Sequence, residues 1–185
     1  MLPLKTPRLL LRDFTAVDFE AFYATTENPE YRRYYPENEL SPSHLKDIFE
    51  RILASTSTQP RIKFPLAICL RNAEAIEELS PIGTCGVRIE AEGGLALSFG
   101  CAIARPHWGK GYAFEASCAL IDYGFSNLPI ERIFAETIAE NSRARTLAER
   151  LGMHLEGQPS RVKFFRGREW DVVTYAITKN EWRGF

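Results

Sequence analysis

The amino-acid sequence predicts an α/β fold of the α+β kind, in which a mixed, mostly antiparallel sheet of about seven strands carries helices on both faces. Three strand-like segments follow one another between residues 63 and 104, which favours antiparallel neighbours. A strand, helix, strand succession then spans residues 95–139 and requires one parallel pairing. The length of 185 residues with 45% hydrophobic residues predicts one domain, residues 1–185.

The N-terminal part of the chain is predicted to hold one strand and two helices. The first strand is Leu9–Asp13, and a short helix over residues 18–25 begins with acidic residues. The second helix begins with Ser41 as N-cap and Pro42 as first residue, because Pro is tolerated where the N–H has no helical partner. Its apolar face consists of Leu45, Ile48, Phe49 and Ile52. The Ser/Thr/Pro segment 55–60 forms the loop that ends it.

The rest of the chain alternates strands with two helices. Acidic residues 74, 77 and 78 mark a turn, and Gly93-Gly94 is a hairpin signal. Apolar residues three, four and seven apart predict the last helix, which Gly152 ends. The predicted strands are 63–71, 81–90, 95–104, 132–139, 155–165 and 169–177, the last two joined at Gly167, and the helices are 113–125 and about 142–151.

Composition excludes several function classes. The formal net charge of −1 gives no general attraction to nucleic acid or to an anionic membrane. The four cysteines lack a C-x-x-C pair and lie in apolar segments, which indicates small core residues in a reducing compartment. The three histidines lie far apart, so no metal site is expected. No leader and no apolar run of about 18 residues is present, so we expect a cytoplasmic protein. We expect it to be a monomer or a homodimer.

One local basic cluster surrounds the turn at Gly167. Two interpretations stay open for it, a solvated hairpin and a contact with a phosphate or an acidic partner. The cluster consists of Arg161, Lys163, Arg166 and Arg168.

The segment 106–116, PHWGKGYAFEA, is the most informative motif. It places Gly109 and Gly111 between a strand and a helix, where free N–H groups and the helix dipole attract an anion. A P-loop would need Ser or Thr after Lys110, and a dinucleotide fingerprint would need a third Gly at residue 114, which is Phe. Both common nucleotide motifs are therefore excluded.

The same segment resembles the cofactor loop of the GNAT superfamily of N-acetyltransferases, and WGKGYAFEA resembles the form found in its ribosomal-protein N-acetyltransferase branch. Other segments resemble that branch in the same order. They are TPRLLLRDF at residues 6–14 with Asp18, Asn28-Pro29-Glu30 with Arg33-Tyr34, Pro81-Ile82-Gly83-Thr84, NSRARTLAERLGM at residues 141–153, and Trp170-Asp171 with Tyr175. The resemblance covers almost the whole chain and implies a splayed sheet and use of acetyl-coenzyme A.

The resemblance also assigns roles around the loop. It implies that the cofactor lies against Trp108, Gly109, Lys110, Gly111, Tyr112 and Ala113. It implies that the backbone N–H of Ile103 stabilises the thioester oxyanion and that Asn141 binds the pantetheine arm. Taken from the residues alone, Ile103 is a core strand residue, Lys110 is an exposed loop lysine, and Asn141 is the N-cap of the helix that follows.

The reaction implied is transfer of acetyl from acetyl-coenzyme A to an amine by direct attack, without an enzyme nucleophile. The resemblance implies that Glu136 is the candidate general base, because it lies five residues before Asn141 as a base glutamate does in one ribosomal-protein acetyltransferase of the superfamily. Its strand-face neighbours Phe134 and Ile138 indicate either a cavity or a solvent-facing strand, so a surface or ion-paired glutamate is the competing interpretation. Glu140 and Glu90 are weaker alternatives.

The chain departs from the branch at three positions. Ala144 stands where a Ser is usual, Ser98 where a Glu is usual, and Cys101 where a Tyr is usual. We expect the acceptor to be a protein N-terminus, with a small-molecule amine and a non-catalytic acetyl-coenzyme A-binding role as the alternatives.

Overall fold

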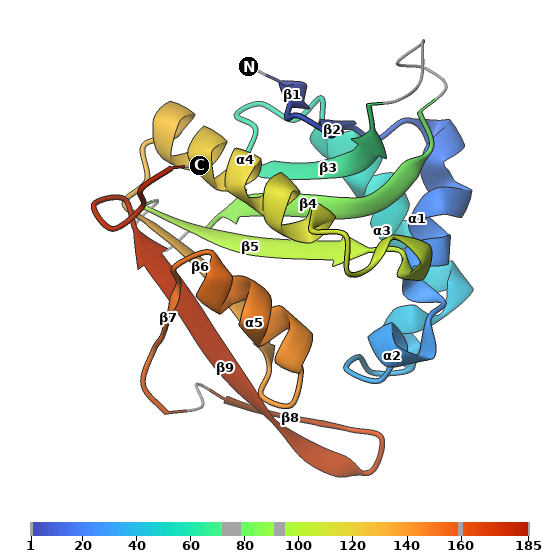
Figure 1. The fold of residues 1–185 in the computed structure, drawn as a ribbon. Helices are drawn as coiled ribbons and strands as arrows, with labels where there is room; N and C mark the ends of the chain where they lie inside the picture. The colour runs from blue at the N-terminus through green and yellow to red at the C-terminus, as the bar shows by residue number, and fades with distance from the viewer. Residues whose placement is uncertain (1, 72–78, 91–94, 159–160, 185) are drawn as a thin grey trace.

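The computed structural model describes residues 2–71, 79–90, 95–158 and 161–184. A nine-stranded sheet with helices on both faces forms the fold (Figure 1). The strand order is β1-β2-β3-β4-β5-β6-β9-β7, and β8 pairs with β9. Every neighbouring pair is antiparallel except β5 and β6, which are parallel. The predicted fold class is confirmed.

The elements follow the predicted order closely. The strands are β1 (Leu4–Lys5), β2 (Leu9–Asp13), β3 (Lys63–Leu70), β4 (Pro81–Ile89), β5 (Ala96–Ile103), β6 (Arg132–Ile138), β7 (His154–Leu155), β8 (Arg161–Phe165) and β9 (Arg168–Thr178). The α-helices are α1 (Phe19–Thr26), α2 (Pro29–Arg32), α3 (Pro42–Ser55), α4 (Tyr112–Asn127) and α5 (Ser142–Arg150). Short 3-10 turns are formed by Ala16–Asp18, Asn38–Leu40 and Arg105–His107.

Two details of the prediction were wrong. The long strand predicted over residues 155–165 is two strands, because Gly157 adopts a positive φ of 59° and the chain leaves the extended conformation there. The two-residue strand β1 was not predicted. The hairpin signal at residues 93–94 and the acidic turn at residues 74–78 lie outside the described residues.

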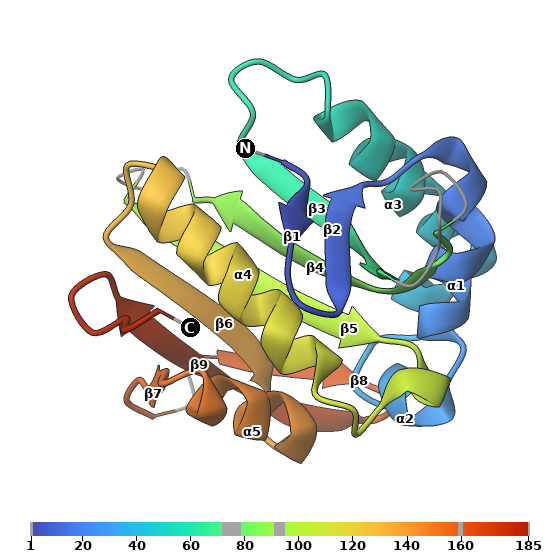
Figure 2. The same ribbon diagram turned by 45° about the horizontal axis from the view of Figure 1, so that its top comes forward.

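Alternate residues of the strands supply two cores, one on each face of the sheet. On β2, Leu9 and Leu11 pack into the core beneath α4, whereas Leu10 packs with Phe22 of α1 and Phe49 of α3. This two-residue period is what a strand buried on both faces requires. Figure 2 shows α4 crossing one face of the sheet, with α1 and α3 on the other.

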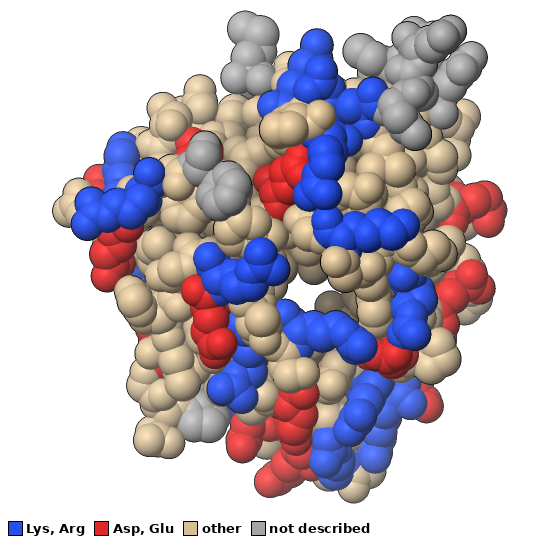
Figure 3. All heavy atoms as spheres, in the orientation of Figure 1, with Lys and Arg blue, Asp and Glu red and all other residues tan. Residues whose placement is uncertain are grey.

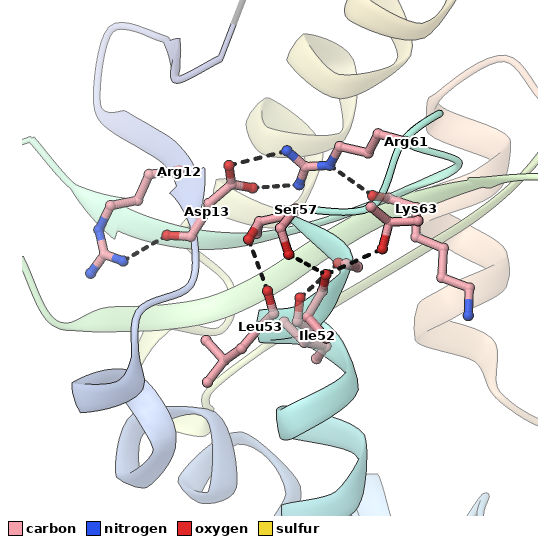
Figure 4. Close-up of polar contacts among 11 residues, drawn as sticks. Arg12, Asp13, Ile52, Leu53, Ser57, Arg61 and Lys63 are labelled. Carbon is pink, nitrogen blue, oxygen red and sulfur yellow. Dashed lines mark hydrogen bonds and ion pairs between the residues drawn. The ribbon is translucent and has the colours of Figure 1, made fainter.

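Ion pairs fasten the N-terminal strand to its surroundings. Arg12 holds the buried carboxylate of Asp18 through two hydrogen bonds of 2.7 and 2.9 Å. Burial alone would raise the pKa of Asp18, but the bonds from Arg12 and Thr15 lower it below its usual value. On the other side of the strand, Arg61 donates two hydrogen bonds to the carboxylate of Asp13 and one to the carbonyl of Lys63 at 2.9 Å (Figure 4).

The feature that positions the site is the short pairing of β5 with β6. The two strands are joined at only three positions, residues 96–98 against residues 132–134. Beyond Ser98 they diverge, whereas β4 stays paired with β5 as far as Ile103 and β9 stays paired with β6 as far as Ile138. The sheet therefore opens into two halves, with α4 on the first and α5 on the second (Figure 1).

Candidate active site

A cleft of about 550 Å³ occupies the gap between β5 and β6. Residues from the ends of both strands, the glycine loop, α4, α5 and α2 all line it. In the space-filling view an opening passes through the molecule between the two halves of the sheet (Figure 3). The divergence of the two strands thus creates the space in which the predicted site residues meet.

Beyond Ser98, the edge of β5 that faces this cleft is not covered by a neighbouring strand of the described chain. Ala104 donates to the carbonyl of Ile82 at 2.8 Å, so the hydrogen-bonded pairs of the β4–β5 ladder fall on even-numbered β5 residues. The N–H of Ile103 therefore points away from β4, toward the gap. The side chain of Ile103 is buried in the core, as expected. Its carbonyl accepts a hydrogen bond from the indole N–H of Trp108 at 2.5 Å.

The glycine loop has the backbone geometry that the motif predicts. Gly109 and Gly111 have positive φ values of 74° and 81°, and Gly111 is the N-cap of α4. These values are uncommon for residues with a side chain. An added Cβ at Gly109 would meet no other atom within 4 Å, so the loop lies open to a ligand. Tyr112 and Ala113 also line the cleft, whereas the exposed Lys110 is not among the residues that line it.

An anchor that sequence reasoning missed holds this loop in place. Glu115 in the first turn of α4 accepts hydrogen bonds from the backbone N–H of Arg8 at 2.9 Å and from its guanidinium at 2.6 Å. Arg8 in turn donates to the carbonyl of Lys110 at 3.0 Å, and its guanidinium lies over the ring of Tyr112. Burial would raise the pKa of Glu115, but the bonds from Thr6 and Arg8 lower it. The N-terminal segment thereby supports the cofactor loop.

Asn141 forms the predicted N-cap of α5. Its side-chain oxygen accepts from the N–H of Ala144 at 3.3 Å. No acceptor for its amide N–H₂ group is found among the residues that the structure describes, and the residue lines the cleft. The amide is therefore available to a ligand carbonyl.

Two arginines of α5 were also missed. Arg143 and Arg150 are seven residues apart, which places them on one helix face, and both line the cleft. The guanidinium of Arg143 lies 4.5 Å from the ring centre of Trp108, and that of Arg150 lies 4.6 Å from the ring centre of Phe114. This seven-residue spacing was the signal in the sequence. The two cations face the end of the cleft where the glycine loop lies.

A carboxylate on α2 joins the two halves of the site. Glu30 is ion-paired with Arg105, which precedes the glycine loop, and with Arg143 at the start of α5. Both arginines pack against Trp108, with Arg105 5.0 Å from its ring centre. The two arginines lower the pKa of Glu30. Trp108 thus packs against two cations as part of a bridge from α2 to the loop and to α5.

Glu136 lines the cleft, which a general base must do. It is also ion-paired, which the alternative of a surface or ion-paired glutamate predicts. Its Oε2 atom is 2.6 Å from Nη2 of Arg161 on β8. The Glu136 side chain is 35% exposed and that of Arg161 is 53% exposed. The weaker alternatives are paired elsewhere, Glu140 with Arg168 and Glu90 with Arg88.

The remaining wall of the cleft is aromatic and comes from α2, the residues just after it and β5. Tyr31 and Tyr35 stack with ring centres 4.7 Å apart, and Tyr34 and Phe99 line the same end. Cys101 also lines the cleft, so the prediction that all four cysteines are core residues was wrong at this position. The cause is the divergence of β5 from β6, which leaves one edge of β5 uncovered.

Nδ1 of His107 is the one buried side-chain polar atom that has no hydrogen-bond partner among the described residues. His107 lines the cleft next to the glycine loop. Burial and, second, the charge of Lys110 lower its pKa, which favours the neutral imidazole. No cluster of three or more metal-ligating side chains is found in the part of the chain that the structure describes.

Comparison with known proteins identifies the family. The family model for the acetyltransferase (GNAT) domain matches residues 8–154, which is most of the chain. The chain belongs to the GNAT family of acetyltransferases. It is an acetyl-coenzyme A-dependent N-acetyltransferase, and the family expected from the sequence is confirmed. In the described ranges no helix of this GNAT enzyme is long and apolar enough to cross a membrane.

Individual GNAT relatives agree with this assignment. An uncharacterised N-acetyltransferase, p20 of Bacillus licheniformis, is 31% identical over 183 residues, covering 98% of each chain. A GNAT-family acetyltransferase from Bacillus anthracis has a similar crystal structure, with a TM-score of 0.79, 25% identity and coverage of 97% and 100%. The ribosomal protein uS5-alanine N-acetyltransferase of Escherichia coli is 34% identical over 87 residues, about 47% of this chain and 45% of its own.

Proposed function

We propose that this enzyme acetylates the N-terminal α-amine of a protein, such as a ribosomal protein, by direct attack of the neutral amine on acetyl-coenzyme A. The observation that carries the proposal is that one cleft brings together the glycine loop, the free edge of β5 and a carboxylate, Glu136. The partial similarity to the enzyme named as a ribosomal protein uS5-alanine N-acetyltransferase supports a protein acceptor.

The donor side of the cleft suits the parts of acetyl-coenzyme A in order. The N–H groups of Gly109 and Gly111, with the N-terminus of α4, would hold the pyrophosphate. Arg143 and Arg150 in the cleft wall, and the exposed Lys110 of the loop, would add positive charge. The free amide of Asn141 and the edge of β5 would pair with the amides of the pantetheine arm. The N–H of Ile103 would then stabilise the negative charge on the thioester oxygen during attack.

The acceptor class follows from the need for a neutral amine. An α-amine with a pKa of about 8 is roughly 10% neutral at pH 7, whereas a lysine with a pKa of about 10.4 is neutral about once in 2,500 molecules. The difference corresponds to about 3 kcal/mol more that a site must supply for a lysine. Glu136 would accept the proton that leaves the amine, with Arg161 fixing its position.

A small-molecule amine is the second candidate acceptor. The aromatic wall of Tyr31, Tyr34, Tyr35 and Phe99 favours it, because such a wall can enclose a compact substrate. A protein N-terminus needs an open route away from this wall for the rest of its chain, and a small amine does not. The two acceptors therefore differ in what they require beyond the amine itself.

The test is an acceptor screen that follows thiol release from acetyl-coenzyme A and identifies the product by mass spectrometry. The panel contains peptides with a free N-terminus, the same peptides blocked at the N-terminus but carrying a lysine, and small amines and polyamines. We expect acetylation of free N-termini and little of the blocked peptides. Turnover confined to small amines would overturn the protein acceptor, and binding of acetyl-coenzyme A without turnover on any amine would favour a non-catalytic role.

A further inference from the structure

We propose that the hollow between α2 and the β8–β9 turn binds an acidic side chain of the acceptor, three or four residues beyond the amine that is acetylated. The proposal rests on the protein acceptor proposed above. The hollow has a volume of about 530 Å³ and is lined by Pro29, Arg32, Arg33, Arg166, Arg168 and Trp170. Figure 3 shows Lys and Arg side chains gathered at the lower end of the molecule, where Figure 1 places the β8–β9 turn.

The four arginines come from two distant parts of the sequence, and two of them are ion-paired in the described part of the chain. Arg166 is paired with Glu37 at 3.0 Å, and Arg168 with Glu140 at 3.4 Å. Arg32 and Arg33 have no carboxylate within ion-pairing distance in the described part of the chain. The Glu37 side chain is 78% exposed, and exposed pairs of this kind are weak, so a ligand carboxylate can compete with them.

Three of the four guanidinium groups are held in position before any ligand arrives, that of Arg32 by donating to the carbonyl of Leu40 at 3.3 Å. Arg166 donates to the carbonyl of Arg32 at 3.2 Å and to that of Tyr35 at 3.4 Å, which fastens the β8–β9 turn to α2. The guanidinium of Arg168 lies 3.3 Å from the ring centre of Trp170. Planar guanidinium groups fixed in this way favour carboxylates, which they can bind through two parallel hydrogen bonds.

The hollow adjoins the aromatic end of the cleft. The segment 29–34, which is α2 and the two residues after it, contributes to both, with Glu30, Tyr31 and Tyr34 lining the cleft and Arg32 and Arg33 lining the hollow. Tyr34 also packs edge-on against Trp170, with ring centres 6.2 Å apart. One helix with its side chains is about 10 Å across, and an extended chain advances about 3.3 Å per residue. An acidic side chain near position 4 of a peptide whose α-amine lies in the cleft would therefore reach the hollow.

A discrete carboxylate suits this surface better than a nucleic acid does. The enzyme has a net charge of −1, and Glu37 and Glu140 lie within the same surface. A phosphate backbone would bring repeated negative charges against those two residues. A single acidic side chain can bind the arginines without bringing repeated negative charges against Glu37 and Glu140.

The experiment compares two peptides that differ only in Asp or Asn at position 4, with acetyl-coenzyme A held at saturation. We expect the Asp peptide to have a KM about tenfold lower than the Asn peptide with a similar kcat, and the ratio to shrink as salt is added. In the Arg32→Gln/Arg33→Gln double variant the ratio of the two KM values should fall to near 1. If the double variant folds poorly, the single variant Arg33→Gln, at an exposed position, takes its place and should lose part of the KM ratio.

The matched control is Lys46→Gln/Arg51→Gln on α3, which removes the same charge at exposed positions away from the hollow and should keep the tenfold ratio. Moving the Asp to position 2 or 8 should abolish the advantage. An equal advantage at every position, or equal KM values for the Asp and Asn peptides with the unmodified enzyme, would overturn the proposal while the proposed function stands. Failure to acetylate either peptide would instead count against the proposed function.

Discussion

The carboxylate of Glu136 on β6 is held 2.6 Å from the guanidinium of Arg161 on β8, at the edge of the cleft. The pair is partly exposed, so its contribution to the stability of the fold is small. The ion pair instead fixes the orientation of the Glu136 carboxylate, which lies at the end of a flexible side chain. A carboxylate aimed in this way can accept a proton from a group that enters the cleft.

Replacing Glu136 with Gln tests whether that proton acceptance matters. If Glu136 is the base, turnover on a confirmed acceptor should fall by about 10² to 10⁴ at pH 7, and the loss should shrink as pH rises, because more of the amine is then already neutral. The melting temperature and the affinity for acetyl-coenzyme A should stay unchanged. Steady-state kinetics across pH, with Arg161→Gln as the companion variant, would measure this. Near-normal turnover of Glu136→Gln at pH 7 would show that the residue is only an ion-pair partner.

Replacing Gly111 with Val should abolish binding of acetyl-coenzyme A. Its φ of 81° disfavours a β-branched residue, and an added Cβ would lie 3.4 Å from the guanidinium of Arg8 that supports the loop. Isothermal titration calorimetry on the folded variant is the measurement.

The control for backbone strain is Gly157→Val, because Gly157 also has a positive φ, 59°, and lies away from the cleft. It should lose some stability and keep its affinity. In the unmodified enzyme, acetyl-coenzyme A at about 100 times Kd should add about 2.7 kcal/mol of stability, while ATP and NAD add much less. Retained affinity in a folded Gly111→Val would remove the loop from the site.

Two substitutions at Asn141 separate its cap from its proposed contact with the donor. Asn141→Asp keeps an oxygen that can accept from the N–H of Ala144 but removes the amide N–H₂ group, so stability should hold while affinity for acetyl-coenzyme A falls. Asn141→Ala removes both and should also cost about 1 kcal/mol of stability. Thermal unfolding and calorimetry together report the two effects. Equal affinity in the Asp variant would limit Asn141 to its capping role.

The pair formed by Arg12 and Asp18 predicts how stability depends on pH. The folded-state pKa of Asp18 lies below its ordinary value, so the pair stabilises the protein above the unfolded pKa near 4, and this stabilisation is lost as pH falls through the folded pKa. Asp18→Asn should cost about 3 kcal/mol at pH 7, because it leaves the largely buried Arg12 without its charge partner.

Urea unfolding at a series of pH values is the measurement for this pair. The difference between the unmodified protein and Asp18→Asn should narrow below about pH 4. A difference that stays constant down to the lowest pH at which both proteins fold would contradict the assignment.

Local chemistry explains what was predictable in the site. Gly111 acts through its backbone at a strand–helix junction, and Asn141 acts through its side chain at a helix start; both features are set by their nearest neighbours in the chain. The period of apolar residues likewise indicates nearly all the strands and helices, because it too is a property of short segments. Arg143 and Arg150 were within reach of the same reasoning, since their spacing along α5 is a local property.

Contacts between distant segments had no such local signal. Arg8 and Glu115 are 107 residues apart, and Arg166 and Glu37 are 129 apart, so nothing in either neighbourhood indicates the other. The sequence by itself determined the order of the elements, the donor loop and the chemistry it attracts. Only the tertiary structure decided where β5 leaves β6, that Glu136 meets Arg161, and that arginines of α2 and the β8–β9 turn share one hollow. The physical reason is that such contacts depend on how the sheet twists and packs, which the whole chain sets together.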